Sequence, residues 1–182
     1  RTGFTPYAER LNGRLAMIAE QCDAYVMHGD SVEAIAAKIA DMKRRREATG
    51  LAPLQFGMAA YAIVRDREEE ARAEQERITA MPETPPRGFD NFDQWLSGTQ
   101  LERQIKLRDY SVSNRGLVPD LVGTPQQVRE KIEAYQNAGL DLLLLQMSPQ
   151  AEEMDRFAET IIAPMKLTDG PRASLAISPA RG

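Results

Sequence analysis

The sequence is poor in the two side chains that most often build metal and redox centres. Cys22 is the single cysteine and His28 the single histidine among 182 residues. One cysteine excludes an intrachain disulfide framework and a zinc site made of cysteines. One histidine excludes a zinc site built on a histidine cluster, and a Ser-His-Asp triad could form only through His28. We therefore expect no metal site.

A surplus of positive charge and long apolar runs are also missing. Lys and Arg number 23 against 27 Asp and Glu, a net charge of -4, whereas nucleic-acid-binding proteins usually carry a basic surplus. The strongest apolar run, residues 140–145, is interrupted by Asp141 and is far shorter than the roughly 20 residues of a membrane span. No secretory signal is visible. We expect a cytoplasmic protein that binds neither nucleic acid nor membranes.

What is present is an alternation of helical patterns and short apolar strands. Strands are predicted at residues 24–27, 55–64 and 141–146, and helices at 6–21, 31–46, 67–81, 124–138 and 152–166. Strands separated by helices indicate βαβ units and a parallel sheet, so the fold class is α/β. A closed eight-unit barrel needs about 200 to 250 residues, so this chain cannot form one by itself.

Helix starts and buried positions follow from local patterns. Asp30 is predicted to cap one helix with Glu33, and Thr124 to cap another with Pro125 at the first helical position and Gln127 closing a capping box. The leucines of residues 142–145 are expected on a strand covered on both faces. In the last helix four side chains are expected to point inward: Met154, Phe157, Ile161 and Ile162.

The alternation is interrupted between residues 81 and 123. Prolines predict a loop at 82–88, and the spacing of aromatic residues predicts a short helix at 89–96, with a second at 100–107. Residues 110–123 contain Ser, Asn, Gly and Pro and are predicted to be an irregular loop. From residue 168 onward small residues and proline dominate, so the tail 168–182 is expected to be disordered.

Ligands of parallel α/β folds gather where the strands end. Three segments follow predicted strands: 28–30, 65–66 and 146–148. His28 precedes a helix start, a suitable place for a phosphate or a flavin, and packing against the loop backbone is an equally open role for it. Arg115, between Asn114 and Gly116, is a candidate anion contact on a loop that could act as a lid, and a solvent-exposed arginine is the alternative.

Several stretches in this order resemble the bacterial luciferase-like flavin monooxygenases. They are residues 23–30, a strand with a short glycine-containing turn; residues 64–71, Val-Arg-Asp-Arg-Glu-Glu-Glu-Ala; residues 121–128, Leu-Val-Gly-Thr-Pro-Gln-Gln-Val; residues 138–141; and residues 152–158. The alkanesulfonate and dimethyl-sulfone monooxygenases are the most similar branch. The resemblance covers most of the chain, from about residue 15 to residue 166.

The resemblance implies a partial TIM barrel, with a helical insertion before the last βα unit. Residues 1–167 would be the C-terminal portion of the barrel, residues 81–123 the insertion or lid, and the chain, which opens on Arg1, a piece of a longer protein. It implies an enzyme that uses reduced FMN, supplied by a separate flavin reductase, and O2 to oxygenate a small organosulfur compound. Arg115 and His28 would be catalytic, and His28, Gly29, Asn114 and Arg115 would contact the cofactor.

Two alternatives to this function stay open. One is a deazaflavin (F420)-dependent oxidoreductase of the same superfamily. The other is a non-catalytic half-barrel that serves as an interaction module. An unclosed sheet leaves unpaired strand edges and an apolar face, so we expect the chain to form homo-oligomers or to need its missing portion.

Overall fold

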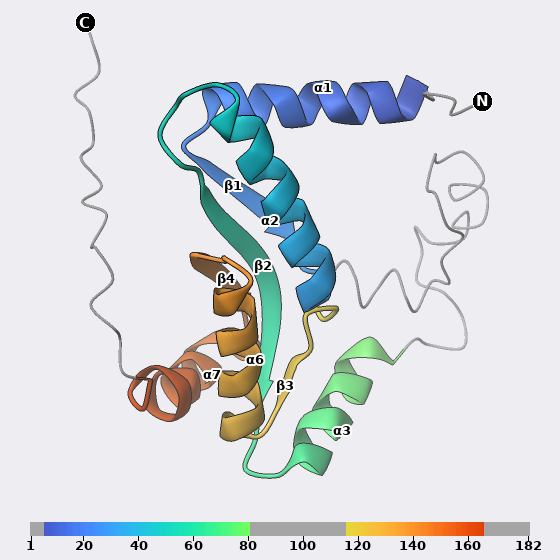
Figure 1. Cartoon of the computed structure of the whole chain (residues 1–182). Coiled ribbons are helices and arrows are strands. Elements are labelled where there is room, and N and C mark those ends of the chain that lie inside the picture. The colour runs from blue at the N-terminus through green and yellow to red at the C-terminus, as the bar shows by residue number, and fades with distance from the viewer. Residues whose placement is uncertain (1–5, 81–115, 166–182) are drawn as a thin grey trace, which may run out of the picture.

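The computed structural model describes residues 6–80 and 116–165 (Figure 1). The predicted insertion helices, Asn114, Arg115 and the tail 168–182 lie outside the described residues. The elements in chain order are α1 (Pro6–Gln21), β1 (Ala24–His28), α2 (Val32–Glu47), β2 (Gln55–Val64), α3 (Glu68–Thr79), β3 (Leu121–Gly123), α6 (Pro125–Asn137), β4 (Leu142–Gln146), α7 (Gln150–Phe157) and the π-helical turn η1 (Ala158–Ile162).

The sheet is built on β2, the longest strand. The first half of β2 pairs in parallel with both β1 and β4, since Val26 and Leu142 are each in register with Gly57. A strand has two edges, so β1 and β4 lie on opposite sides of β2. The second half of β2 pairs in parallel with β3, where Val122 lies opposite Ile63. The predicted α/β fold with a parallel sheet is confirmed.

One side chain marks the start of the pairing between β2 and β4. The backbone N–H of Asp141 donates to the carbonyl oxygen of Phe56 over 2.8 Å. In return, the backbone N–H of Phe56 donates to the Asp141 carboxylate, also over 2.8 Å. Asp141 therefore joins the two strands through both its backbone and its side chain, directly before the run of four leucines begins.

Two helices begin at a residue whose side chain caps them, α2 at Ser31 and α6 at Thr124. The capping box of α6 is confirmed: the Thr124 hydroxyl accepts from the Gln127 N–H, and the Gln127 side chain accepts from the Thr124 N–H. The prediction that Asp30 caps α2 is wrong, because the Ser31 hydroxyl accepts the cap hydrogen bond from Ala34. The Asp30 carboxylate accepts from the Ser31 N–H instead.

The main core lies between the sheet and the helices α2, α6 and α7, which cover one face of it. From β2 it receives alternate side chains, Phe56, Met58, Ala60, Ala62 and Val64. Pointing the other way, Tyr61 and Ile63 form a smaller cluster with Ala71 of α3, Leu117 and Val122. This alternation follows from the period of two along a strand.

Three local predictions are wrong. The predicted loop 110–123 ends in the strand β3, so the segment before it precedes two βα units, β3–α6 and β4–α7. The strand β4 is not covered on both faces, because Leu142 and Leu144 are 52% and 45% exposed. In the last helix Phe157 and Ile161 are buried as expected, but Met154 and Ile162 are half exposed.

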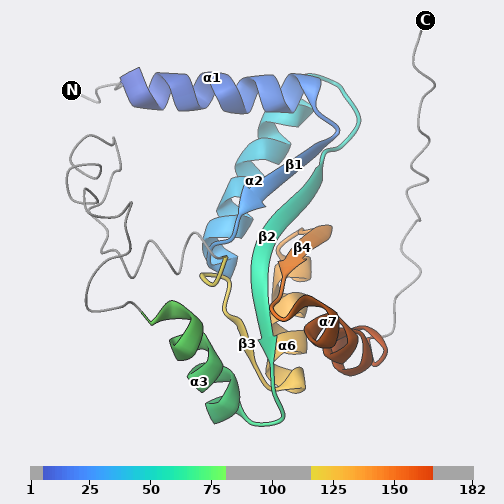
Figure 2. The same cartoon turned by 180° about the vertical axis from the view of Figure 1, so that it is seen from behind.

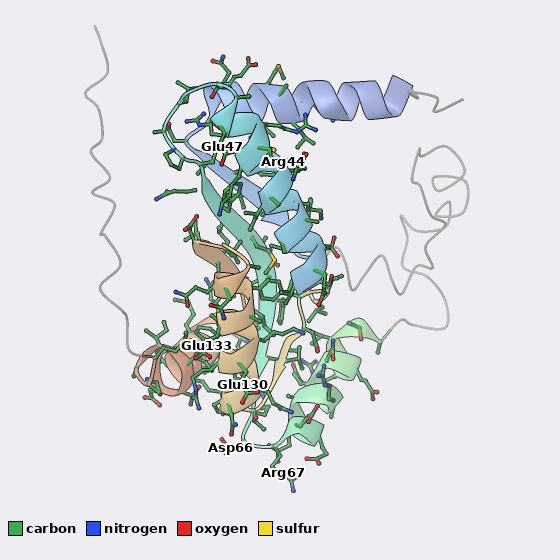
Figure 3. All side chains as sticks on the ribbon, in the orientation of Figure 1. Arg44, Glu47, Asp66, Arg67, Glu130 and Glu133 are labelled. Atoms are coloured by element: carbon green, nitrogen blue, oxygen red, sulfur yellow. The ribbon has the colours of Figure 1, made fainter. Side chains whose placement is uncertain are left out.

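The basic end of α2 divides into exposed and buried charges. Arg44 and Glu47 lie on the outer surface of its last turn (Figure 3). Arg46 is buried and donates to the carbonyl oxygen of Ala19 over 2.6 Å. The guanidinium of Arg46 therefore fastens the end of α1 to α2. Within residues 6–80 and 116–165, no helix combines the length and the apolar character needed to cross a membrane.

Candidate active site on the open face of the sheet

One face of the sheet is left open by the helices. In Figure 2 the strands β1 and β2 lie in front of α2 and α6, so this view looks onto that face. Its side chains form rows across the strands, because residues in register point to the same side. The first row is Val26, Gly57 and Leu142, the second is His28, Ala59 and Leu144, and the third is Tyr61 and Gln146.

The middle of this face is shallow because β2 contributes only Gly57 and Ala59 there. A Cβ atom built on Gly57 would lie 3.1 Å from Val26 Cγ2 and 3.6 Å from Leu142 Cδ2, so both side chains border the glycine. Val26 is 47% exposed, as expected of an apolar side chain with no cover in the described chain. We call the side chains of these three rows the open face. On it, β2 forms an apolar floor, and the side chains of β1 and β4 rise on either side of that floor.

His28 lies at the C-terminal end of β1, in the second row of the open face. It is the last residue of β1, and it is exposed in the row with Ala59 and Leu144. Within the described residues its imidazole makes no hydrogen bond. A histidine placed this way can donate or accept a proton toward a ligand on the floor.

Gly29 is needed for close packing directly after His28. A Cβ atom at this position would overlap the ring of Pro119 and lie 2.7 Å from the carbonyl oxygen of Ala59. The residue therefore lets the turn 116–120 lie against the end of β1. The structure gives Gly29 this packing role, and its predicted contact with a cofactor stays a prediction.

Tyr135 of α6 ties the two loops beside His28 together. Its ring is fully buried, and its hydroxyl lies 2.6 Å from the carbonyl oxygen of Asp30 and 3.2 Å from that of Pro119. Burial, with a smaller contribution from nearby carboxylates, raises the pKa of Tyr135 to about 12. The hydroxyl therefore stays protonated and able to donate at physiological pH.

Asp30 is held by its own contacts. Lys38 donates to its carboxylate over 2.8 Å. Burial raises the pKa of Asp30, but the hydrogen bonds from Lys38 and the Ser31 N–H outweigh that effect, so the pKa lies below its ordinary value. The charged carboxylate helps to fix the turn that follows His28.

Arg65, which follows β2, is engaged in the fold. Its guanidinium donates over 2.7 Å to the buried carboxylate of Glu153 in the first turn of α7. Asp66 and Arg67 lie beyond it on the turn to α3 (Figure 3). Of the three predicted strand ends, the 65–66 segment therefore serves to anchor α7, while His28 and Gln146 face the open side.

The described chain resumes at Gly116, beside the same site. The backbone N–H of Tyr61 donates to the Gly116 carbonyl oxygen over 2.7 Å, and Gly116 has a φ of 76° that suits glycine. Tyr135 was not among the site residues predicted from the sequence, because its contacts with Asp30 and Pro119 join segments that are far apart in the chain. Among the described residues, no group of three or more His, Cys, Asp or Glu side chains could hold a metal ion.

Comparison with known proteins places this geometry in a family. Residues 12–142 match the family model described as luciferase-like monooxygenase. The chain is 30% identical over 161 residues to a sulfoquinovose monooxygenase of Novosphingobium aromaticivorans, covering 79% of this chain and 44% of the relative. It is also 30% identical over 171 residues to an FMNH2-dependent dimethylsulfone monooxygenase of Pseudomonas putida, covering 89% of this chain and 46% of the relative.

The fold is also found in a solved structure. The crystal structure of DmoA from Hyphomicrobium sulfonivorans superimposes with a TM-score of 0.59 at 20% identity, over 82% of this chain and 38% of that one. The chain thus spans about half the length of the curated relatives it matches. With its parallel strands, its covering helices and the match over residues 12–142, the chain belongs to the luciferase-like monooxygenase family.

Proposed function

We propose that this chain supplies part of the active site of an FMNH2-dependent monooxygenase that acts with O2 on a small organosulfur compound. The proposal rests on the open face, an apolar floor with His28 at the C-terminal end of β1, in a member of the luciferase-like family. Two relatives are named as monooxygenases of sulfoquinovose and of dimethylsulfone, and these names support an organosulfur compound as the substrate.

The residues of the open face suit a flavin. A planar ring system needs an apolar surface, and the exposed side chains of Val26, Leu142 and Leu144 supply one on this face. When bound, reduced FMN supplies the electrons that activate O2. The apolar side chains would exclude water from the reacting atoms, and His28 and Gln146 would contact polar atoms of the ring or substrate.

Anionic groups require a further contact. Arg65 is already paired with Glu153, so we assign the flavin phosphate or an anionic substrate group to Arg115, with Asn114 beside it. A guanidinium suits this role because its planar fork can make two parallel hydrogen bonds to an oxyanion. The predicted lid, residues 81–123, would then carry this contact.

The proposal includes a separate reductase that supplies reduced FMN in the cytoplasm, and a homo-oligomeric assembly. The FMNH2 dependence of the Pseudomonas putida relative favours FMN over a deazaflavin.

The alternative function is a non-catalytic interaction module. Flavin binding distinguishes the monooxygenase from such a module.

The test is a flavin titration followed by an oxygenation assay. The chain, alone and mixed with the portion of the Pseudomonas putida enzyme that it does not match, is titrated with FMN while flavin fluorescence is recorded. Consumption of dimethylsulfone is then measured with reduced FMN and O2. His28→Ala should weaken FMN binding or lower turnover about tenfold or more, while Glu47→Ala on the outer surface of α2 should change neither. If no flavin binds under either condition, the proposed function is wrong.

A further inference from the structure

The turn beside His28 contains a strained residue. Among residues 6–80 and 116–165, Asp120 is the one residue other than glycine with a positive φ, which is 57°. In this left-handed region a Cβ atom crowds the carbonyl group that follows, so a residue other than glycine stays there only where its contacts hold it. Asp120 therefore needs a contact that compensates for its backbone conformation.

Arg72 of α3 supplies that contact. Its two terminal nitrogens donate to the two carboxylate oxygens of Asp120, Nη1 over 2.5 Å and Nη2 over 3.3 Å. The two side chains are 39% and 43% exposed, and an isolated ion pair at such a surface usually stabilises little. A pair with two parallel hydrogen bonds inside a network holds a more defined geometry.

Such a network surrounds Arg72. Its Nη1 also donates to the Gln75 side chain over 3.1 Å, and its Nε lies 3.6 Å from one carboxylate oxygen of Glu68. The other oxygen of Glu68 accepts from the Gln127 side chain over 2.6 Å, and Gln127 closes the capping box of α6. Arg72 thus joins the turn to two helices through several contacts.

The same turn packs against the residues that follow His28. Pro119 is fully buried, and a Cβ atom on Gly29 would overlap its ring. The Tyr135 hydroxyl donates to the carbonyl oxygens of both Pro119 and Asp30. Gly29 and Asp30 directly follow His28, so the place of the turn determines how the end of β1 is held.

We propose that Arg72 is a positioning residue that acts on His28 through Asp120. Arg72 holds the left-handed backbone of Asp120, and that backbone keeps the turn 117–120 against Gly29. The turn in return fixes the end of β1, from which the imidazole faces the floor of the open face. The catalytic meaning of this role rests on the proposed function, whereas the placement of His28 can be measured without flavin.

A merely structural role for Arg72 gives different expectations. If Arg72 only stabilised α3 through Glu68 and Gln75, its loss would lower stability and leave the surroundings of His28 unchanged. Position 120 separates the backbone from the ion pair, because glycine adopts a positive φ freely. Asp120→Gly loses only the pair, whereas Asp120→Ala loses the pair and also disfavours the backbone conformation.

The test reads His28 directly. It is the single histidine of the 182-residue chain, so every imidazole proton signal in the NMR spectrum of the full chain belongs to it. Arg72→Met and Asp120→Ala should shift or broaden these signals, and Asp120→Gly should leave them close to those of the parent. Arg72→Lys, which keeps the charge without the planar fork, should give an intermediate change. Arg67→Met is the matched control, because Arg67 pairs with Glu70 three residues along the chain, and it should shift nothing.

A double variant tests whether Arg72 acts through His28. In the flavin titration and the oxygenation assay, Arg72→Met should weaken FMN binding or lower turnover about tenfold. The same change in a His28→Ala background should have no further effect, because the side chain that it positions is no longer present.

The outcomes separate this role from the proposed function. Circular dichroism must show that each variant is folded at the temperature of measurement; if Arg72→Met is not, Arg72→Lys takes its place. Unchanged His28 signals in the Arg72 variant and in Asp120→Ala, equal shifts in Asp120→Gly and Asp120→Ala, or a full effect of the Arg72 variant without His28 would each overturn the inference. Shifted signals as expected in a chain that binds no FMN would keep Arg72 as the residue that positions His28 and reject the proposed function.

Discussion

Tyr135→Phe tests how the loops beside His28 are held. The variant keeps the buried ring and removes only the hydroxyl that donates to the carbonyl oxygens of Asp30 and Pro119. Losing the donor to a buried acceptor costs about 1–3 kcal/mol, because the acceptor keeps its desolvation penalty. The ring leaves no cavity behind, so the whole loss comes from the hydrogen bond. We expect the free energy of unfolding at neutral pH to fall by about 2 kcal/mol.

The pH dependence gives a second, independent signature. The folded pKa of Tyr135 is about 12, above the value of about 10 in an unfolded chain. A raised folded pKa means that the stabilisation is complete below pH 10 and is lost as the pH rises toward 12, by about 1.4 kcal/mol per pH unit. The Tyr135→Phe variant has no hydroxyl and therefore lacks this pH-dependent stabilisation. The difference in stability between parent and variant should therefore shrink above pH 10.

The assay is urea unfolding followed by circular dichroism at pH 8, 10 and 11, with the parent and variant measured in parallel so that other titrating groups cancel. Tyr25→Phe on β1 is the control, because Tyr25 is half buried and makes no hydrogen bond through its hydroxyl within the described residues. It should lose less than about 0.5 kcal/mol. A variant at Tyr135 as stable as the parent, or a gap that stays constant with pH, would refute the reasoning.

Three further changes test other contacts by urea unfolding. Gly29→Ala should cost about 1–3 kcal/mol because the new Cβ overlaps a proline ring; full stability would contradict the packing. Arg65→Met should cost about 1–3 kcal/mol, because the buried carboxylate of Glu153 loses its 2.7 Å partner and keeps only Arg156 at 4.0 Å, and a neutral change would show the Arg65 contact to be dispensable. Leu143→Ala, toward the helices, should cost about 2 kcal/mol, and Leu142→Ala on the open face under about 1 kcal/mol; equal losses would contradict the assigned faces.

Short sequence patterns predicted most of the helices and strands. The capping box at Thr124 and Gln127 depends on side chains three residues apart, and β2 is apolar over ten residues, so neither needs knowledge of distant contacts. β3 was missed because three residues among glycine and proline carry no strand period. The exposure of Leu142 and Leu144 could not be read, because four successive leucines look the same whether one face is covered or two.

The candidate site was predicted only where it follows a strand end. His28 was found because it closes an apolar run and precedes a helix, and the structure places it on the open face. Tyr135 is more than a hundred residues from Asp30 in the chain, so their contact exists only in the folded molecule. Arg65 was a reasonable candidate by position, but its partner Glu153 lies on another βα unit and no local pattern indicates the pairing.

The pair formed by Asp141 and Phe56 has a consequence for how β4 aligns. Residues 142–145 are identical leucines, so sliding β4 by two positions along β2 would still exchange leucine for leucine at two of these four positions, one on each face. The side chains of the strand itself therefore specify its alignment weakly. Asp141 is different, since both its N–H and its carboxylate meet Phe56, and a slide would break both hydrogen bonds. One aspartate thus sets which leucine stands beside Gly57 and, through it, the height of Gln146 relative to His28.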